Sequence, residues 1–291
     1  MTPIIQVQGL HHTYLPGTPF ETVALQGVDM EVGEGAIVAI IGPTGSGKST
    51  LIQHFNGLIR PQKGKVIVAG QDLSDEKLDI RALRRQVGLI FQSPEQQLFE
   101  QYVGDDVAFG PRNFGLDKEE VRQRVRKAME MVGLSFEGFK DRLTFSLSGG
   151  EMRKVAIAGV LALEPKVLVF DEPTCGLDPA TSREFLTKIR DLHTREGITI
   201  ILASHNMEDV AQLADRIYVI VGGRSVLEGT PQQIFSQPEL LRAHGLDVPQ
   251  VTQVMHGLWS RGRQVRTDLL TVGEAEEEIC RCLGFAEEDA H

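Results

Sequence analysis

A glycine-rich run that ends in lysine and serine is the part of this sequence with the plainest chemistry. Residues 42–50 match the phosphate-loop pattern G-x-x-x-x-G-K-[ST], directly after an apolar run and before a helical pattern. Backbone N–H groups of such a loop wrap a phosphate, and the following helix adds its positive dipole. Lys48 can reach the β- and γ-phosphates, and the Ser49 hydroxyl is a hard oxygen ligand that suits Mg²⁺. The predicted phosphate-binding residues are Gly42, Pro43, Thr44, Gly45, Ser46, Gly47, Lys48, Ser49 and Thr50.

Two adjacent carboxylates follow another apolar run. Residues 167–170 are apolar, and Asp171 and Glu172 come next, which is how parallel sheets deliver acids to the edge where ligands bind. We expect Asp171 to hold Mg²⁺, directly or through water, and Glu172 to polarise the water that attacks the γ-phosphate. Acids at the end of a strand are commonly structural, so it is the phosphate loop upstream that favours the catalytic role.

A second phosphate-binding site is predicted at residues 147–151, Leu-Ser-Gly-Gly-Glu, which place a hydroxyl and two glycines at the start of another helical stretch. With this pair of cradles the sequence resembles the ATP-binding cassette (ABC) ATPases, whose signature is Leu-Ser-Gly-Gly-Gln. Glu151 departs from that signature, but Ser148, Gly149 and Gly150, which would contact phosphate, are intact. The resemblance implies two ATP molecules sandwiched in a head-to-tail dimer, each between one subunit's phosphate loop and the other's signature.

The same resemblance implies roles for further residues. Gln92 matches the glutamine that senses Mg²⁺ and the attacking water and links them to the transport partner. His205 matches the histidine that contacts the γ-phosphate, although a lone histidine is more often a structural hydrogen-bonder. Asp178 belongs to the Gly-Leu-Asp loop by which family dimers couple their two sites. Tyr14 resembles the aromatic that stacks on adenine, with a strand residue packed in the sheet as the alternative. Cys175 stands where alanine or serine is usual and is expected to be a small filler.

The hydrophobic pattern predicts the elements that must position these residues. Continuous apolar runs indicate buried strands, and apolar positions at helical spacing indicate helices. An antiparallel pair is expected at 4–14 and 23–32, followed by a helix that begins with the helical pattern at 48–58 and by a mostly helical insertion at about 95–163. Buried strands are expected at 36–41, 66–69, 87–91, 166–170 and 198–203, and a hairpin at 216–227.

These elements predict the α/β fold class. With the resemblance, the expected architecture is the P-loop NTPase fold of the ABC cassette, which combines a RecA-like parallel sheet core, an antiparallel β subdomain and a helical subdomain. The cassette is expected to span residues 1–228. A small C-terminal domain at 229–291, acidic toward its end, resembles the accessory domain that such ATPases use in dimer contacts.

Composition and charge exclude several other classes. The 291 residues are 41% apolar and 24% charged, close to the globular average, and the net charge of −10 disfavours a nucleic-acid binder. Three cysteines, Cys175, Cys280 and Cys282, are too few for a disulfide framework and fit a reducing compartment. No apolar run approaches the roughly 20 residues that cross a bilayer, and the N-terminus lacks a signal-peptide pattern. We therefore expect a cytoplasmic protein.

The stretch after Gln92 best distinguishes the kind of cassette. Residues 91–100 and 106–116 resemble the energy-coupling-factor (ECF) branch of importers, whose ATPases drive uptake of vitamins or of cobalt and nickel. The resemblance implies hydrolysis of MgATP by a peripheral protein on the cytoplasmic side of the cell membrane. Its implied partners are a second ATPase, a membrane scaffold (T) subunit and a substrate-binding (S) subunit, with no nucleic acid. Acids after Gln92 are expected to face arginines of a scaffold helix; they are Glu95, Glu100, Asp105 and Asp106.

Two alternatives stay open at this stage. The chain could be the ATPase of another ABC importer class, or a non-transport ABC ATPase that acts on nucleic acid. The second kind typically carries a long coiled-coil insertion, for which the spacing between Lys48 and Ser148 leaves no room. The cargo, and the choice between a homodimer and a heterodimer with a similar ATPase, are left undetermined by the sequence.

Overall fold

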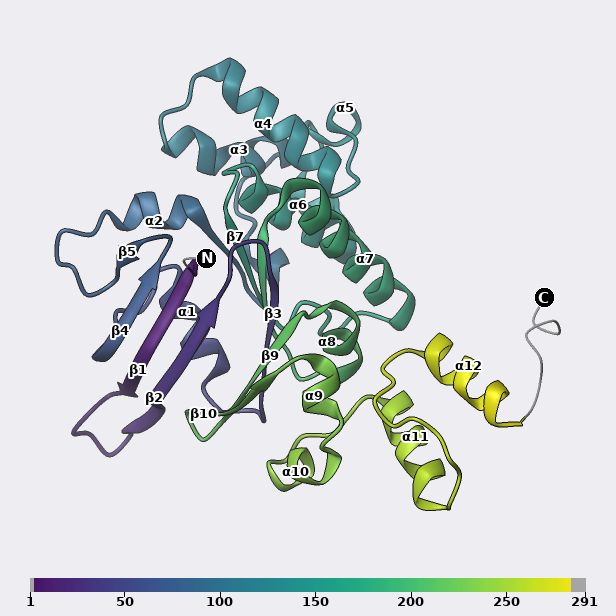
Figure 1. Cartoon of the computed structure of the whole chain (residues 1–291). Helices are drawn as coiled ribbons and strands as arrows, with labels where there is room; N and C mark the ends of the chain where they lie inside the picture. The colour runs from purple at the N-terminus through teal and green to yellow at the C-terminus, as the bar shows by residue number, and fades with distance from the viewer. Residues whose placement is uncertain (1–2, 284–291) are drawn as a thin grey trace.

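A six-stranded, mostly parallel sheet forms the centre of the protein (Figure 1). The computed structural model describes residues 3–283. The strand order is β10-β9-β3-β8-β7-β6, and β10 pairs antiparallel with β9. The strands are β3 (Ile37–Ile41), β6 (Val87–Ile90), β7 (Val167–Asp171), β8 (Thr199–Ala203), β9 (Arg216–Val221) and β10 (Arg224–Gly229). β3, β6 and β8 are buried along their whole length, which explains their continuous apolar sequence and confirms the predicted α/β fold class.

An antiparallel sheet packs on one face of this core. Its order is β2-β1-β4-β5, formed by β1 (Ile5–Tyr14), β2 (Thr22–Val32), β4 (Lys63–Val68) and β5 (Gln71–Asp72). Its inner side chains share one hydrophobic cluster with α1 (Lys48–Phe55) and with Val167 and Val169 of β7. α1 ends earlier than the sequence predicted, because the chain turns at Gly57, whose φ is 66°. Tyr14, at the end of β1, lies near α1, because its hydroxyl contacts Thr50 of that helix.

Helices cover the other face of the parallel sheet. Alternate residues of β7, Leu168 and Phe170, point into this second cluster, as the two-residue repeat of a strand requires. Between β6 and β7 the chain forms η1 (Pro94–Gln97), α3 (Val103–Asn113), α4 (Lys118–Met131), α5 (Phe136–Phe139), η2 (Thr144–Ser146) and α6 (Gly149–Leu161). α3, α4 and α6 contact one another and lie above the sheet in Figure 1.

Three helices were not singled out by the sequence patterns. α2 (Ile80–Gln86) precedes β6, α7 (Pro179–Glu196) follows β7, and α8 (Met207–Leu213) follows β8. Each begins at a side chain that accepts hydrogen bonds from the first turn, namely Asp79, Asp178 and Asn206. Such N-caps satisfy backbone N–H groups that a helix start leaves unpaired.

The C-terminal region divides into two parts by its packing. α9 (Pro231–Phe235) and α10 (Pro238–Ala243) pack against the parallel sheet, where Phe235 and Leu241 join β3 and β9 in one cluster. α11 (Gln250–Ser260) and α12 (Val272–Leu283) enclose a small core of their own. We therefore propose that the small domain begins near residue 249 rather than at 229. The end of the acidic tail, 284–291, lies outside the described residues. Within residues 3–283, no helix combines the length and apolar character needed to cross a membrane.

A buried histidine in α1 predicts a pH-dependent stability. His54 is fully buried, its Nδ1 donates to the Thr50 carbonyl at 2.7 Å, and its Nε2 has no partner among residues 3–283. Burial lowers the pKa of His54 from 6.5 to about 4. His54 binds a proton more tightly in the unfolded chain than in the folded chain. Its contribution to the free energy of unfolding is therefore fully present above its pKa in the unfolded chain, and it is lost as the pH falls toward its pKa in the folded chain.

Comparison with His54→Gln, which does not titrate, isolates this contribution. Between about pH 7.5 and pH 4.5, the wild-type free energy of unfolding should fall by about 2 to 3 kcal/mol more than that of the variant. Urea unfolding at both pH values measures the difference. Equal pH dependence in the two proteins would show that His54 makes no such contribution.

Candidate functional site

The phosphate loop connects the end of β3 to the start of α1. Gly45 and Gly47 have φ values of 78° and 103°, a left-handed region that favours residues without a Cβ. At Gly42 the requirement is steric, because a Cβ would lie 2.1 Å from the Ile220 carbonyl oxygen. α1 begins at Lys48, so the unpaired N–H groups of its first turn face the loop. The backbone therefore has the shape of a phosphate cradle.

Lys48 is folded back into this loop. Its Nζ donates to the carbonyl oxygens of Gly42 at 2.8 Å and Pro43 at 3.2 Å, and the residue is buried. Burial lowers the pKa of Lys48, while Glu172 and Asp171 act in the opposite direction. Ser46 Oγ, also in the loop, is buried without a partner among the described residues. A bound phosphate would supply acceptors for such groups, so the loop fits the triphosphate of a nucleotide.

Ser49 and Asp171 come together although they are far apart in sequence. Ser49 Oγ lies 3.2 Å from Asp171 Oδ1, because α1 starts beside the carboxyl end of β7. Burial raises the pKa of Asp171, and the neighbouring Glu172 charge adds to that effect. A divalent cation would favour the ionised carboxylate. These two oxygen ligands therefore fit Mg²⁺.

Glu172 sits in a strained backbone conformation directly after β7. Its φ is 51°, a left-handed value that is uncommon for non-glycine residues and concentrates at functional sites. His205 donates to Glu172 Oε2 through its backbone N–H at 3.2 Å and through Nδ1 at 2.7 Å. The structure thus brings together the carboxylate and the histidine that the sequence placed at two separate strand ends.

Gln92 contacts the loop that follows Glu172. Its Nε2 donates to Cys175 Sγ at 3.3 Å, so the glutamine loop touches the loop after β7. Cys175 was expected to be a small filler; in the structure its thiol is the contact point for Gln92. The metal role expected for Gln92 stays a prediction.

The signature segment forms a helix start. Ser148 is the N-cap of α6: its Oγ accepts from the Glu151 N–H at 3.3 Å, and Glu151 Oε2 accepts from the Ser148 N–H at 2.8 Å. This reciprocal pair is a capping box, which either glutamate or glutamine can form, so the departure at Glu151 preserves the local fold. Gly149 and Gly150 are exposed with open space around them. Among residues 3–283, no atom lies within 4 Å of a Cβ built at either glycine, so the approach of a phosphate is open on this side.

Tyr14 and Asp178 occupy different settings. The Tyr14 hydroxyl lies 3.2 Å from Thr50 Oγ1, and its ring packs edge-on against His12. Tyr14 is therefore next to the phosphate-loop helix, with its ring partly exposed. The Asp178 carboxylate caps α7 by accepting from the Ala180 and Thr181 N–H groups at 2.9 and 3.1 Å. Adenine stacking by Tyr14 and a nucleotide role for Asp178 both stay predictions.

One of the four acids after Gln92, Asp106, requires a correction. Asp106 was expected to face a partner, but it is buried and accepts from the N–H groups of Phe99 and Glu100, each at 2.9 Å. Asp105 is paired with Arg112 at 2.8 Å. The region also exposes large hydrophobic side chains; they are Phe99, Tyr102, Phe109, Leu143 and Phe145. We call these five residues the aromatic surface.

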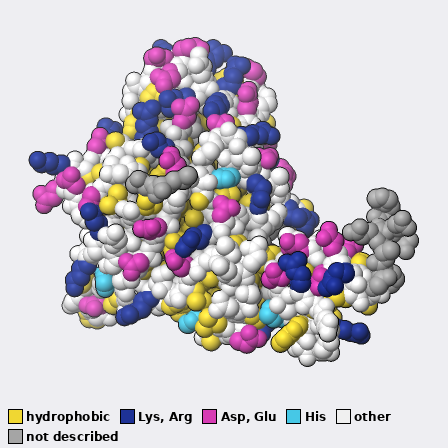
Figure 2. Space-filling view, in the orientation of Figure 1, with side chains coloured by type: hydrophobic (Ala, Val, Ile, Leu, Met, Phe, Trp, Pro, Cys, Tyr) yellow, Lys and Arg dark blue, Asp and Glu magenta, His cyan; other side chains and the backbone are white. Residues whose placement is uncertain are grey.

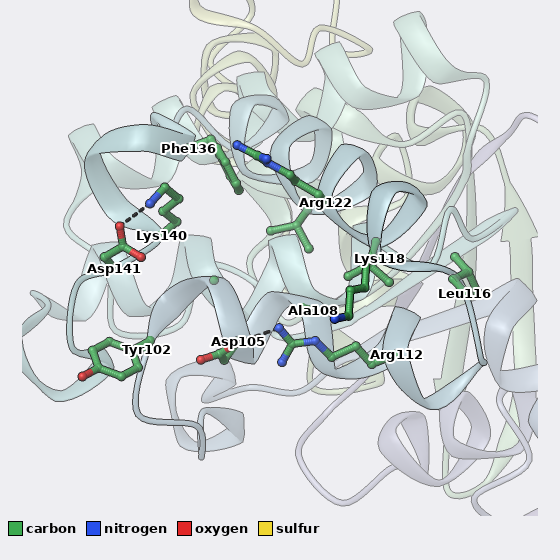
Figure 3. A pocket seen from close by; sticks show the side chains of 13 residues that line it. Tyr102, Asp105, Ala108, Arg112, Leu116, Lys118, Arg122, Phe136, Lys140 and Asp141 are labelled. Carbon is green, nitrogen blue, oxygen red and sulfur yellow. Dashed lines mark hydrogen bonds and ion pairs between the residues drawn. The ribbon is translucent and has the colours of Figure 1, made fainter.

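A cavity of about 850 Å³ lies between α3, α4 and α5, beside the aromatic surface (Figure 3). Its apolar wall includes Val121, Val125 and Phe136. Figure 3 shows Arg112 directed at Asp105, and Lys140 at Asp141. Its charged lining comprises Asp105, Asp141, Arg112, Lys118, Arg122 and Lys140. This face of the helical region is therefore mixed in charge and not uniformly acidic.

Sequence reasoning missed Arg153. This arginine of α6 is 8% exposed, and its guanidinium donates to carbonyl oxygens of Pro173, Gln92 and Cys175. A charged residue five positions after the signature serine was a weak signal. Helical spacing does not reveal which loops a side chain will reach.

The comparisons with known proteins agree with this geometry. Residues 25–175 match the ABC transporter family. The energy-coupling factor transporter ATP-binding protein EcfA2 of Clostridium perfringens is 49% identical over 94% of this chain and 96% of its own length. The EcfA2 protein of Caldanaerobacter subterraneus is 50% identical over 96% of this chain and 97% of its own length.

Two solved structures extend the comparison. The structure of cbiO1 from Clostridium perfringens, described as part of the ABC transporter complex cbiONQ, has a TM-score of 0.75 and 38% identity and covers 88% of this chain and all of its own. A dimeric ATP-binding cassette in a post-hydrolysis state, bound to ADP and Pi, has a TM-score of 0.69 and 27% identity over 78% of this chain and 98% of its own.

The chain belongs to the ABC transporter family, among its energy-coupling-factor transporter ATP-binding proteins, and is an ATPase. The resemblance drawn from the phosphate loop, the signature and the stretch after Gln92 is confirmed.

Proposed function

We propose that this chain is the ATP-hydrolysing subunit of an ECF-type importer and powers uptake of a vitamin or of cobalt or nickel through membrane partners. One observation carries the proposal: the phosphate loop, the Ser49 and Asp171 pair and the Glu172 and His205 pair meet at one sheet edge. They do so in a chain about half identical to ECF ATP-binding proteins over nearly its whole length.

One chain supplies the phosphate-loop, Mg²⁺-binding and base residues of an ATP site. Lys48 leaves the loop carbonyls for the β- and γ-phosphates, and Ser49 and Asp171, with Gln92, hold Mg²⁺. When bound, Mg²⁺ neutralises charge on the phosphates. Glu172 positions and polarises the attacking water, and His205, which already contacts Glu172, contacts the γ-phosphate.

A second ATPase subunit, identical or similar, completes each ATP site. Because Ser148, Gly149 and Gly150 stand exposed at the start of α6, they are available to the ATP on the other subunit's phosphate loop, and we place Asp178 at the same dimer interface. We expect the C-terminal region to form further contacts in the dimer. Figure 2 shows hydrophobic side chains on the surface of this region, around α10 and α11, where Leu240, Val254 and Trp259 are exposed.

The aromatic surface is the docking site we propose for the membrane scaffold. Phe99 and Phe109 pack edge-to-face with ring centroids 4.6 Å apart, and Tyr102 pairs with Leu143 in an isolated bridge. Contiguous exposed apolar side chains mark protein interaction sites. The ATPase then works as a peripheral protein on the cytoplasmic side of the cell membrane, with T and S subunits as partners and without nucleic acid.

Co-purification tests this function. Detergent extracts of cells that express the full-length chain should yield a complex with a polytopic membrane protein, identified by mass analysis. Phe109→Glu should lower its recovery about tenfold or more, since a buried apolar contact becomes a buried charge. Phe20→Glu is the matched control, because Phe20 is an exposed aromatic in the turn between β1 and β2. Recovery of nucleic acid in place of the membrane protein would contradict transport.

A further inference from the structure

Arg153 is a charged side chain buried at the meeting point of three segments. Its residue exposure is 8%, and a buried charge is tolerated only where it is well paired. Nη1 donates to the Pro173 carbonyl at 3.0 Å, and Nη2 donates to the carbonyls of Gln92 and Cys175, each at 3.4 Å. The carboxylate of Glu95 lies 4.0 Å away. The planar guanidinium is therefore neutralised by one acid and anchored by three carbonyls.

The three carbonyls belong to the loops that carry the proposed catalytic groups. Pro173 and Cys175 follow Glu172, whose left-handed backbone requires surrounding contacts to persist. The Cys175 N–H donates back to the Glu172 carbonyl at 3.1 Å, which closes this turn. Gln92 lies in the other loop and also contacts Cys175 through its side chain at 3.3 Å. One guanidinium thus clamps the glutamate turn to the glutamine loop.

Arg153 also connects these loops to the signature. It lies on α6, five residues after Ser148, which places it about 7.5 Å further along the helix axis. A helix transmits displacement as a rigid element, so movement of Ser148 and Gly149 toward ATP on the other subunit also moves the clamp. Arg124, in α4, is the contrasting case, because it too is little exposed but pairs with the carboxylates of Glu120 and Glu164.

We propose that Arg153 is a positioning residue that couples the signature helix to both catalytic loops of its own chain and holds Glu172 and Gln92 in register. The proposal rests on the catalytic roles proposed above. Lysine cannot replace this arginine, since an ammonium lacks the planar fork that reaches three acceptors. Arg153→Lys therefore keeps the charge and removes the clamp.

The first measurement is the rate of ATP hydrolysis by the full-length chain, in the complex in which it hydrolyses ATP. Arg153→Lys should lower kcat about tenfold or more and change the KM for ATP by less than about threefold, since misplacement of catalytic groups affects the chemical step while the phosphate loop stays intact. Arg124→Lys, the matched control, should leave both parameters unchanged. An unchanged kcat for Arg153→Lys, or an equal loss in Arg124→Lys, would overturn the proposal.

Reactivity of Cys175 gives a second measurement that does not depend on catalysis. With Cys280 and Cys282 replaced by serine, the rate of alkylation of Cys175 in the ATP-free chain should rise severalfold in Arg153→Lys and stay constant in Arg124→Lys, because release of the loops exposes the thiol. Unchanged labelling would overturn the positioning role. Increased labelling together with wild-type turnover by Glu172→Gln would instead refute the proposed base and leave the clamp standing.

A second variant covers the case in which Arg153→Lys does not fold. Glu95→Gln removes the neutralising carboxylate and leaves the arginine, so its Cys175 labelling should rise about twofold. Constant labelling in Glu95→Gln would then reject the clamp.

Discussion

Replacing Glu172 with glutamine is expected to lower ATP turnover by at least about a hundredfold, because a general base contributes roughly 10² to 10⁴ in rate. Glutamine keeps the size of the side chain and can still accept a hydrogen bond, but it cannot take a proton from water. Binding of ATP should persist, since the contacts of the phosphate loop and of Lys48 do not involve the Glu172 side chain directly. The variant should therefore accumulate in its ATP-bound form.

Phosphate release and equilibrium binding of ATP together check this expectation. Glu184→Gln is the matched control, because Glu184 is an exposed acid on α7 that pairs with Lys188 and Lys154. It should hydrolyse ATP at the wild-type rate. Wild-type phosphate release by Glu172→Gln would remove Glu172 as the base. Loss of ATP binding would instead indicate that the left-handed turn at Glu172 supports the phosphate loop.

Placing aspartate at Gly149 is expected to block hydrolysis at the phosphate loop of the other subunit, by about a hundredfold. The new carboxylate would lie against the triphosphate in an interface that excludes water, where like charges repel strongly. The variant should fold, because a Cβ at Gly149 meets no described residue within 4 Å and an acid in the first turn of α6 is favourable for the helix dipole. Gly149→Asn, nearly equal in size but neutral, should lose much less activity.

Paired variants reveal which phosphate loop the signature serves. Gly149→Asp in this chain is combined with loss of the phosphate-loop lysine in the other ATPase subunit, which should leave one working site and measurable turnover. Both changes in this chain alone should leave none, since each site then lacks one half. The reverse pattern would mean that the signature acts on its own chain's ATP and would contradict the sandwich.

The features predictable from sequence are those built by neighbouring residues. The phosphate loop needs glycines that allow left-handed turns at Gly45 and Gly47 and a helix start at Lys48, and all of these lie within one short segment. The acids after β7 follow a strand whose continuous apolar run already predicts burial. The ABC resemblance added residues that no local pattern could assign, Gln92 and His205 among them.

Only the tertiary structure determines which residues distant in sequence come into contact and in which direction their pKa values shift. The Ser49 contact with Asp171 and the Arg153 clamp on two loops depend on the packing of α1 and α6 against the sheet. Burial, a property of the whole fold, opposes ionisation of Lys48 and Asp171. It also turned Asp106, an expected docking acid, into a support for the loop at Phe99. Residue types and spacing thus determined the chemistry that is possible, and long-range packing determined which groups are close enough to perform it.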